Sequence, residues 1–170
     1  MKKLLIIPVL LALVSCAPAF NNVSFTNSVQ AGLLSGSEIL LLTPKDGSSG
    51  TEIGLGSGAI VASMTCTQLS SRACRVTLDR DHSNILDVDD STLSNYKYIV
   101  VPYIVKWEDN VTAWSGKPDK LILSYDIFDS HRNKITTAEI NAQGTSVTMK
   151  STDPSSLIDK PLKEILDQLF

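Results

Sequence analysis

The residues best suited to binding a partner lie in one loop between two predicted strands. This loop holds both tryptophans of the chain and three acids: Trp107, Trp114, Glu108, Asp109 and Asp119. Indole side chains are amphipathic and enriched at binding hot spots, and the carboxylates would either orient a polar partner or pair with nearby lysines. About twelve residues join the strands, more than a tight hairpin needs. The loop therefore predicts a partner-binding site, and burial of the indoles for stability is the alternative.

Two other loops match ligand-binding templates in part. Residues 54–59, Gly-Leu-Gly-Ser-Gly-Ala, follow the dinucleotide pattern G-x-G-x-x-A, but about ten residues separate them from the preceding predicted strand, where that motif needs a tight turn. Five positions of a calcium loop are matched by Asp79, Asp81, Ser83, Asp87 and Asp90. That loop lacks the template's glycine and its final glutamate. A flexible helix entry and a solvated acidic connection explain both patterns, so we expect no cofactor and no metal.

Cysteine and histidine supply few candidates for catalysis. His82 and His131 lie in predicted loops without a nucleophile partner, and the sequence contains neither a G-x-S-x-G nor an H-E-x-x-H motif. We therefore expect no enzymatic activity and no catalytic residue. Cys66 and Cys74 are spaced so that a helix end can turn back into a strand between them. In an oxidising compartment this spacing permits a disulfide, and two buried thiols are the alternative.

Residues 1–15 have the features of a secretory signal peptide. Lys2 and Lys3 precede the eleven-residue apolar run Leu4–Val14, which is too short for a spanning helix of about 20 apolar residues. Residues 13–16, Leu-Val-Ser-Cys, resemble the lipobox of bacterial lipoprotein signals. The resemblance implies cleavage before Cys16 and acylation of Cys16 with fatty chains such as palmitate, which would anchor the protein without spanning the membrane. Ala17, in place of Asp, implies by the same resemblance the outer membrane and a periplasm-facing domain.

The charge balance excludes one class of partner. The whole chain carries a formal net charge of -3, and loss of Lys2 and Lys3 with the leader would make it more negative. Nucleic-acid binding needs a basic surface to contact phosphates. We therefore expect no nucleic-acid partner.

The remaining sequence divides into a polar tether, residues 16–37, and one globular domain, residues 38–170. Within the tether, residues 20–25 could form a short edge strand. Strands are predicted at 38–43, 74–78, 98–107, 121–128 and 134–147, and helices at 57–71, about 90–96, and 161–169. The order strand-helix-strand-helix-strand-strand-strand-helix predicts a single mixed sheet with helices packed on it, in the α/β class and bordering on α+β.

The loop motif also carries a family resemblance. Trp107-Glu108-Asp109, Thr112, Trp114-Ser115-Gly116 and Asp119, together with residues 40–46 and 56–58, resemble a family of small bacterial lipoproteins known as a domain of unknown function. The resemblance covers residues 38–170, and it implies similarity in topology to the TolB amino-terminal domain. It also implies an accessory domain that acts on an envelope partner, but no reaction, because a fold does not fix a function.

These observations together predict a non-catalytic, membrane-anchored envelope lipoprotein. Its domain would be an accessory or interaction module of a periplasmic or outer-membrane complex, with an envelope protein as its partner. The alternative is a periplasmic sensor that binds a small molecule or a cation through the glycine and aspartate loops.

Overall fold

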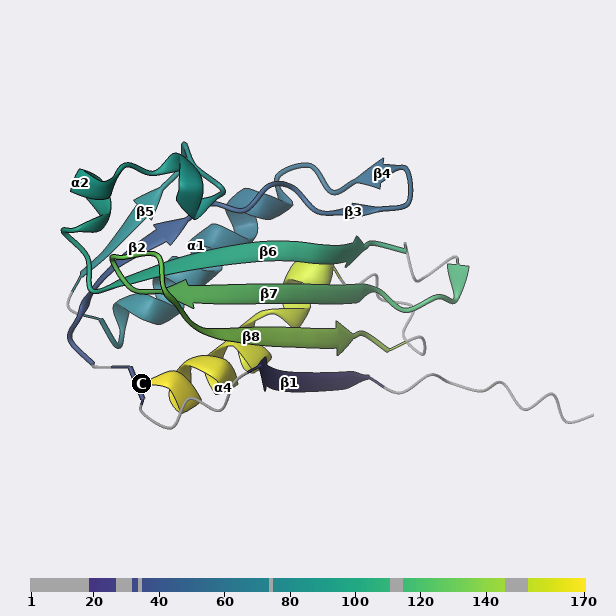
Figure 1. Ribbon diagram of the computed structural model, residues 1–170. Helices are drawn as coiled ribbons and strands as arrows, with labels where there is room; N and C mark the ends of the chain where they lie inside the picture. The colour runs from purple at the N-terminus through teal and green to yellow at the C-terminus, as the bar shows by residue number, and fades with distance from the viewer. Residues whose placement is uncertain (1–18, 27–31, 34, 74, 111–114, 146–152) are drawn as a thin grey trace, which may run out of the picture.

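The sheet that organises the molecule is mixed, and its parallel and antiparallel parts are separate. The computed structural model describes residues 19–26, 32–33, 35–73, 75–110, 115–145 and 153–170 (Figure 1). In these ranges, six strands pair in the order β1-β8-β7-β6-β2-β5. Their bounds are β1 Phe20–Thr26, β2 Glu38–Leu42, β5 Arg75–Asp79, β6 Tyr98–Glu108, β7 Lys120–Phe128 and β8 Lys134–Gln143. Strand β2 runs parallel to β5 and β6, and the remaining pairs are antiparallel.

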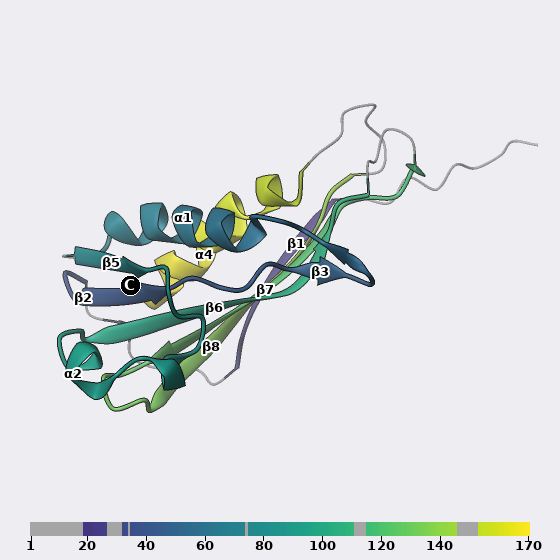
Figure 2. The ribbon, with the colours of Figure 1, turned by 90° about the horizontal axis from the view of Figure 1, so that it is seen from above.

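Helices cover both faces of this sheet. Figure 2 shows α1 (Ser57–Ser70) and α4 (Asp159–Leu169) together on one face, and the short α2 (Asp90–Leu93) on the other. Single 3₁₀ turns, η1 (Ile85–Asp87) and η2 (Pro154–Leu157), precede α2 and α4. The predicted fold class, a mixed sheet with helices packed on it, is confirmed. No helix in the described parts of the chain is long and apolar enough to cross a membrane.

The larger core lies between the sheet and the pair α1 and α4. Strand β7 turns Leu121, Leu123, Tyr125 and Ile127 into this core, as its alternating pattern predicts. The facing stripe of α4 is the predicted one, namely Leu162, Ile165, Leu166 and Leu169. Burying each such side chain stabilises the fold by about 1.5–3 kcal/mol.

A smaller core fills the opposite face. Strand β2 places Ile39 and Leu41 in the larger core but Leu40 and Leu42 in the smaller one, so its run of apolar residues is buried on both sides. The smaller core is closed by the segment that carries η1 and α2, through Ile85, Val88 and Leu93.

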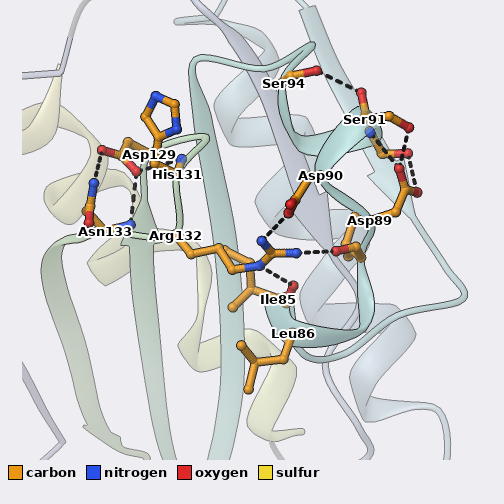
Figure 3. Close-up of polar contacts among 12 residues, drawn as sticks. Ile85, Leu86, Asp89, Asp90, Ser91, Ser94, Asp129, His131, Arg132 and Asn133 are labelled. Atoms are coloured by element: carbon orange, nitrogen blue, oxygen red, sulfur yellow. Dashed lines mark hydrogen bonds and ion pairs between the residues drawn. The ribbon is translucent and has the colours of Figure 1, made fainter.

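Arg132 ties this covering segment to the β7–β8 turn (Figure 3). Its guanidinium pairs with Asp90 and donates to the carbonyl oxygens of Val88, at 2.6 Å, and Ile85, at 3.5 Å. The turn itself is shaped by Asp129, whose carboxylate accepts from the backbone N–H groups of His131 and Asn133. The smaller core is therefore held by polar contacts at its edge as well as by apolar packing.

The short edge strand that residues 20–25 could form within the predicted tether is present: β1 lies at the edge of the sheet, pairs along its whole length with β8 and turns Val23 and Phe25 toward the larger core. One element differs from the sequence predictions. The segment between the predicted strand at 38–43 and the predicted helix at 57–71, where no strand was expected, contains a hairpin, β3 (Ser48–Ser49) with β4 (Glu52–Ile53). Strands of two residues carry no readable alternation, which explains why the pattern did not indicate this hairpin.

Smaller differences concern helix ends and faces. Helix α1 is preceded by Gly56 in the left-handed conformation, with φ of 82°, so Ser57 is its first residue and not its cap. Its buried face includes Thr65, which shares a hydrogen bond with the Tyr125 hydroxyl, and leaves Cys66 half-buried. Strand β6 accommodates Pro102 because its pairing with β2 ends at Val100 and a register shift follows Ile104.

Candidate functional site

An open cleft lies where the β3–β4 hairpin and the start of α1 meet the end of β6. Its volume is about 390 Å³, and it brings together Trp107, Glu108 and Asp109 from the tryptophan motif. The wall opposite these residues consists of Ile53, Leu55 and Ile60 from the hairpin segment and α1. Three of the five predicted partner-binding residues therefore line one depression in the surface. We call this depression the motif cleft.

Trp107 forms the floor of the motif cleft and is itself packed. Its side chain is 7% exposed and belongs to the larger core. Gly54 covers the indole so closely that a Cβ added there would lie 2.6 Å from a ring carbon. A Cβ on Gly47 would meet Ile104 at 2.3 Å. The hairpin segment thus needs glycine at these two positions to lie against β6, and the indole contributes more to packing than to exposed surface.

Glu108 is held by lysines on its own and the neighbouring strand. Its carboxylate lies 2.8 Å from Lys106 Nζ and 4.0 Å from Lys120 Nζ, and it accepts a 3.4 Å hydrogen bond from the Ser49 hydroxyl. The hydrogen bond from Lys106 is the main cause that lowers the pKa of Glu108 below its usual value. Asp109, the next residue, is exposed at the mouth of the cleft.

Asp119 closes the base of the tryptophan loop from inside. Its side chain is fully buried, and its carboxylate accepts a 2.8 Å hydrogen bond from the backbone N–H of Asn110. The Asn110 side chain donates to the carbonyl oxygen of Pro118 at 2.8 Å. Asp119 therefore positions the loop and does not present its carboxylate to a partner. Trp114 lies outside the described residues.

The glycines that match the dinucleotide pattern serve a contact within the chain. The carboxylate of Asp46 accepts from the backbone N–H groups of Gly58, at 2.8 Å, and Gly56, at 3.0 Å. These two bonds lower the pKa of Asp46. A Cβ on Gly58 would lie 2.2 Å from the Pro44 carbonyl oxygen, so this approach requires glycine. The start of α1, where a dinucleotide fold would bind a phosphate, thus already receives a carboxylate of the same chain.

Two of the aspartates that match the calcium-loop template, Asp79 and Asp90, contact different partners. Asp79 accepts from the backbone N–H groups of Asp81 and His82, and lies 2.8 Å from the His82 ring nitrogen Nδ1. Asp90 pairs with Arg132 at the other side of the acidic segment. Across the described ranges, no group of three or more His, Cys, Asp or Glu side chains could hold a metal ion.

The Asp79–His82 pair was not predicted, although the two residues are three apart in sequence. A turn that follows a strand brings such residues together, and this spacing was the available signal. Cys66 lies half-buried on α1, whereas Cys74 and Cys16 lie outside the described residues. The disulfide and the lipid anchor therefore stay predictions.

Solved structures share this arrangement of strands and helices. Two PelC dodecamer structures from Paraburkholderia phytofirmans are similar at TM-scores of 0.58 and 0.55, with 13% and 15% identity. They cover 87% and 85% of this chain and 98% and 96% of their own chains. Protein XCC0632 from Xanthomonas campestris, of the DUF330 family, is similar at a TM-score of 0.50 with 10% identity, over 82% of this chain and 85% of its own. At such identities the likeness shows the fold alone.

A search of curated proteins found no match. The tryptophan motif predicts membership of a family known as a domain of unknown function, and one family model matches this chain. The model described as Domain of unknown function (DUF4823) matches residues 31–169, and the chain belongs to that family.

Proposed function

We propose that this protein is a non-catalytic, lipid-anchored lipoprotein of the bacterial outer membrane whose periplasmic domain binds an envelope protein at the motif cleft. The signal-like residues 1–15 and the lipobox-like residues up to Cys16 support the anchor. The resemblance of the motif to a lipoprotein family supports the envelope location, and a topology like that of the TolB amino-terminal domain is part of this proposal.

The observation that supports the binding role is that two separate segments of the chain line the motif cleft. Residues 107–109 were singled out from sequence, and the hairpin that faces them is remote in the chain, yet both line one open depression. The lining combines the apolar side chains of Ile53, Leu55 and Ile60 with polar and acidic ones, and protein interfaces likewise join an apolar centre to a polar rim. PelC chains of similar fold assemble as dodecamers, so a domain of this fold is able to act through protein–protein contacts.

The alternative sensor role would use loops whose polar groups already have partners within the chain. The Asp46 carboxylate accepts a hydrogen bond from a backbone N–H group at the start of α1. Asp79 pairs with His82, and Asp90 pairs with Arg132. We therefore prefer a protein partner over a small ligand or cation bound at these loops.

Crosslinking in cells tests the binding role. A photoreactive amino acid at position 109 should capture a specific envelope protein, whereas the same group at exposed position 87, on η1, should not. Asp109→Lys should abolish capture from a second cleft position, such as 52, in a variant that circular dichroism shows to be folded at the assay temperature. Asp87→Lys is the matched charge reversal and should leave capture intact. Equal capture from positions 109 and 87 would contradict a site at the cleft.

A further inference from the structure

One end of the sheet gathers the motif cleft and the start of β1. Register pairs join Phe20 to Gln143, Gln143 to Lys120, and Lys120 to Glu108, so these residues form a row across four strands. The β3–β4 hairpin joins this row, because the Ser49 hydroxyl donates to Glu108. Figure 1 shows the start of β1, the ends of β6 and β8, and the hairpin at the same right-hand end. We call it the motif end of the sheet.

The chain length fixes how far the motif end can lie from an anchor at Cys16. Only residues 17–19 separate Cys16 from Phe20, the first residue of β1. A fully extended chain advances by at most about 3.6 Å per residue, so the two Cα atoms lie no more than about 14 Å apart. Acyl chains on Cys16 would therefore hold the motif end close to the lipid headgroups, whereas the β7–β8 turn lies at the far end of the strands.

Large apolar side chains are exposed at the motif end. Leu55 is 85% exposed, Ile53 63% and Phe20 44%. Amphipathic surfaces bind membranes by burying such groups about 5–10 Å into the boundary between headgroups and acyl chains. The cleft beside Leu55 and Ile53 carries the acidic side chains of Glu52, Glu108, Asp109 and Asp153, of which Glu108 is paired with Lys106 and Lys120. This composition favours a zwitterionic lipid surface over an anionic one.

We infer that the motif end rests on the membrane, with Leu55, Ile53 and Phe20 in contact with lipid as a second attachment beside the acyl anchor. This inference rests on the lipidation proposed above. It deepens the proposed function, because the motif cleft would then open beside the bilayer and meet its partner at the membrane surface.

Fluorescence quenching in vesicles tests the inference. The lipidated chain, with Cys66→Ala and Cys74→Ala, receives a bimane label through Leu55→Cys or, as a matched control, Leu86→Cys. Leu86 is 73% exposed and lies beside Ile85, whose carbonyl oxygen contacts Arg132 of the β7–β8 turn (Figure 3). In phosphatidylethanolamine and phosphatidylcholine vesicles with brominated acyl chains, the loss of fluorescence should be several-fold greater at position 55 than at 86.

Flotation of the vesicles separates failure of the anchor from failure of the inference. A chain that does not float, with an unmodified Cys16 by mass spectrometry, contradicts the lipoprotein proposal. A chain that floats but shows equal quenching at both positions, or quenching only with anionic lipid, overturns the lipid contact alone. Amide exchange of the chain with native cysteines gives a second readout. Vesicles should protect residues 52–55 more than residues 84–88, and protection of 52–55 only in native membranes would indicate a protein occupant instead.

Discussion

At the scale of single residues, Asp79 and His82 form a pH-sensitive pair beside the acidic segment. Burial opposes ionisation of Asp79, but hydrogen bonds from His82 and from two backbone N–H groups outweigh it, so its pKa is lowered. The hydrogen bond to Asp79 is the largest cause that raises the pKa of His82 above its ordinary value. The charged pair is therefore favoured in the folded chain.

The pair predicts a specific pH dependence of stability. Because the folded pKa of His82 is raised, its contribution is complete below the unfolded histidine pKa of about 6.5 and is lost as pH rises through the folded value. Asp79→Asn should lower the His82 pKa, measured by NMR titration of the ring protons. The stability difference between wild type and variant should be larger below that pH range than above it. A His82 pKa that is the same in both chains would contradict the pairing.

Residue types and spacing predicted which residues of the motif lie together but not how each is used. Trp107, Glu108 and Asp109, which are consecutive in sequence, line one cleft, and whether a partner binds there stays a prediction. Trp107 is covered by Gly54, and the Asp119 carboxylate accepts a hydrogen bond from the backbone N–H of Asn110. Both contacts form only when the loops close. An isolated acid in a loop is usually solvated, so the internal role of Asp119 had no local signal.

At the scale of elements, the β7–β8 turn and the α2 segment depend on each other through Arg132. This residue adopts φ of 62°, a left-handed conformation that side chains with a Cβ rarely occupy. The turn places its guanidinium against Asp90 and two carbonyl oxygens of the covering segment. We take the contacts to offset the local strain.

Replacing Arg132 should loosen the smaller core from its edge. Arg132→Ala removes charge-assisted hydrogen bonds and keeps a Cβ in the left-handed region, so we expect a loss of about 2 kcal/mol in the free energy of unfolding by urea. Arg132→Gly removes the same contacts but relieves the backbone strain, so it should lower the free energy of unfolding by less. Arg75→Ala, which breaks an exposed pair with Glu38 at 2.9 Å, is the control and should cost under about 1 kcal/mol. Equal effects of Arg132→Ala and Arg75→Ala would contradict a stabilising role for the Arg132 contacts.

Elements of four or more residues, such as the short helix α2, were predictable from their patterns and flanking residues, whereas the two-residue strands β3 and β4 were not. The alternation along β7 and the stripe of α4 predicted both the element and its buried face. Helix α4 nevertheless begins at Asp159, so Pro161 is its third residue and not its first. The first turn of a helix tolerates proline at more than one position, because its N–H groups lack partners within the helix.

At the scale of the whole molecule, the class of fold followed from the order of elements, but the order of strands did not. Placing β2 between β5 and β6, and β1 outside β8, depends on which edges remain open when the cores close. The clearest consequence concerns residues 20–26, whose polar composition indicated a tether in which a short edge strand could form. The pairing of β1 with the whole of β8 outweighs that composition, because β8 would otherwise present an open edge.

Substitutions in β1 distinguish a strand from a tether. Phe25 is half-buried against the larger core, so Phe25→Ala should lower the free energy of unfolding by about 2 kcal/mol. Asn21 is exposed on the same strand, and Asn21→Ala should stay within about 0.5 kcal/mol of wild type. Deletion of residues 17–26 should also expose the edge of β8, which favours concentration-dependent oligomers in size-exclusion chromatography. If Phe25→Ala unfolds like wild type and the deletion elutes in the same oligomeric state as the full chain, the first strand contributes nothing to the fold, and the sheet begins at Glu38.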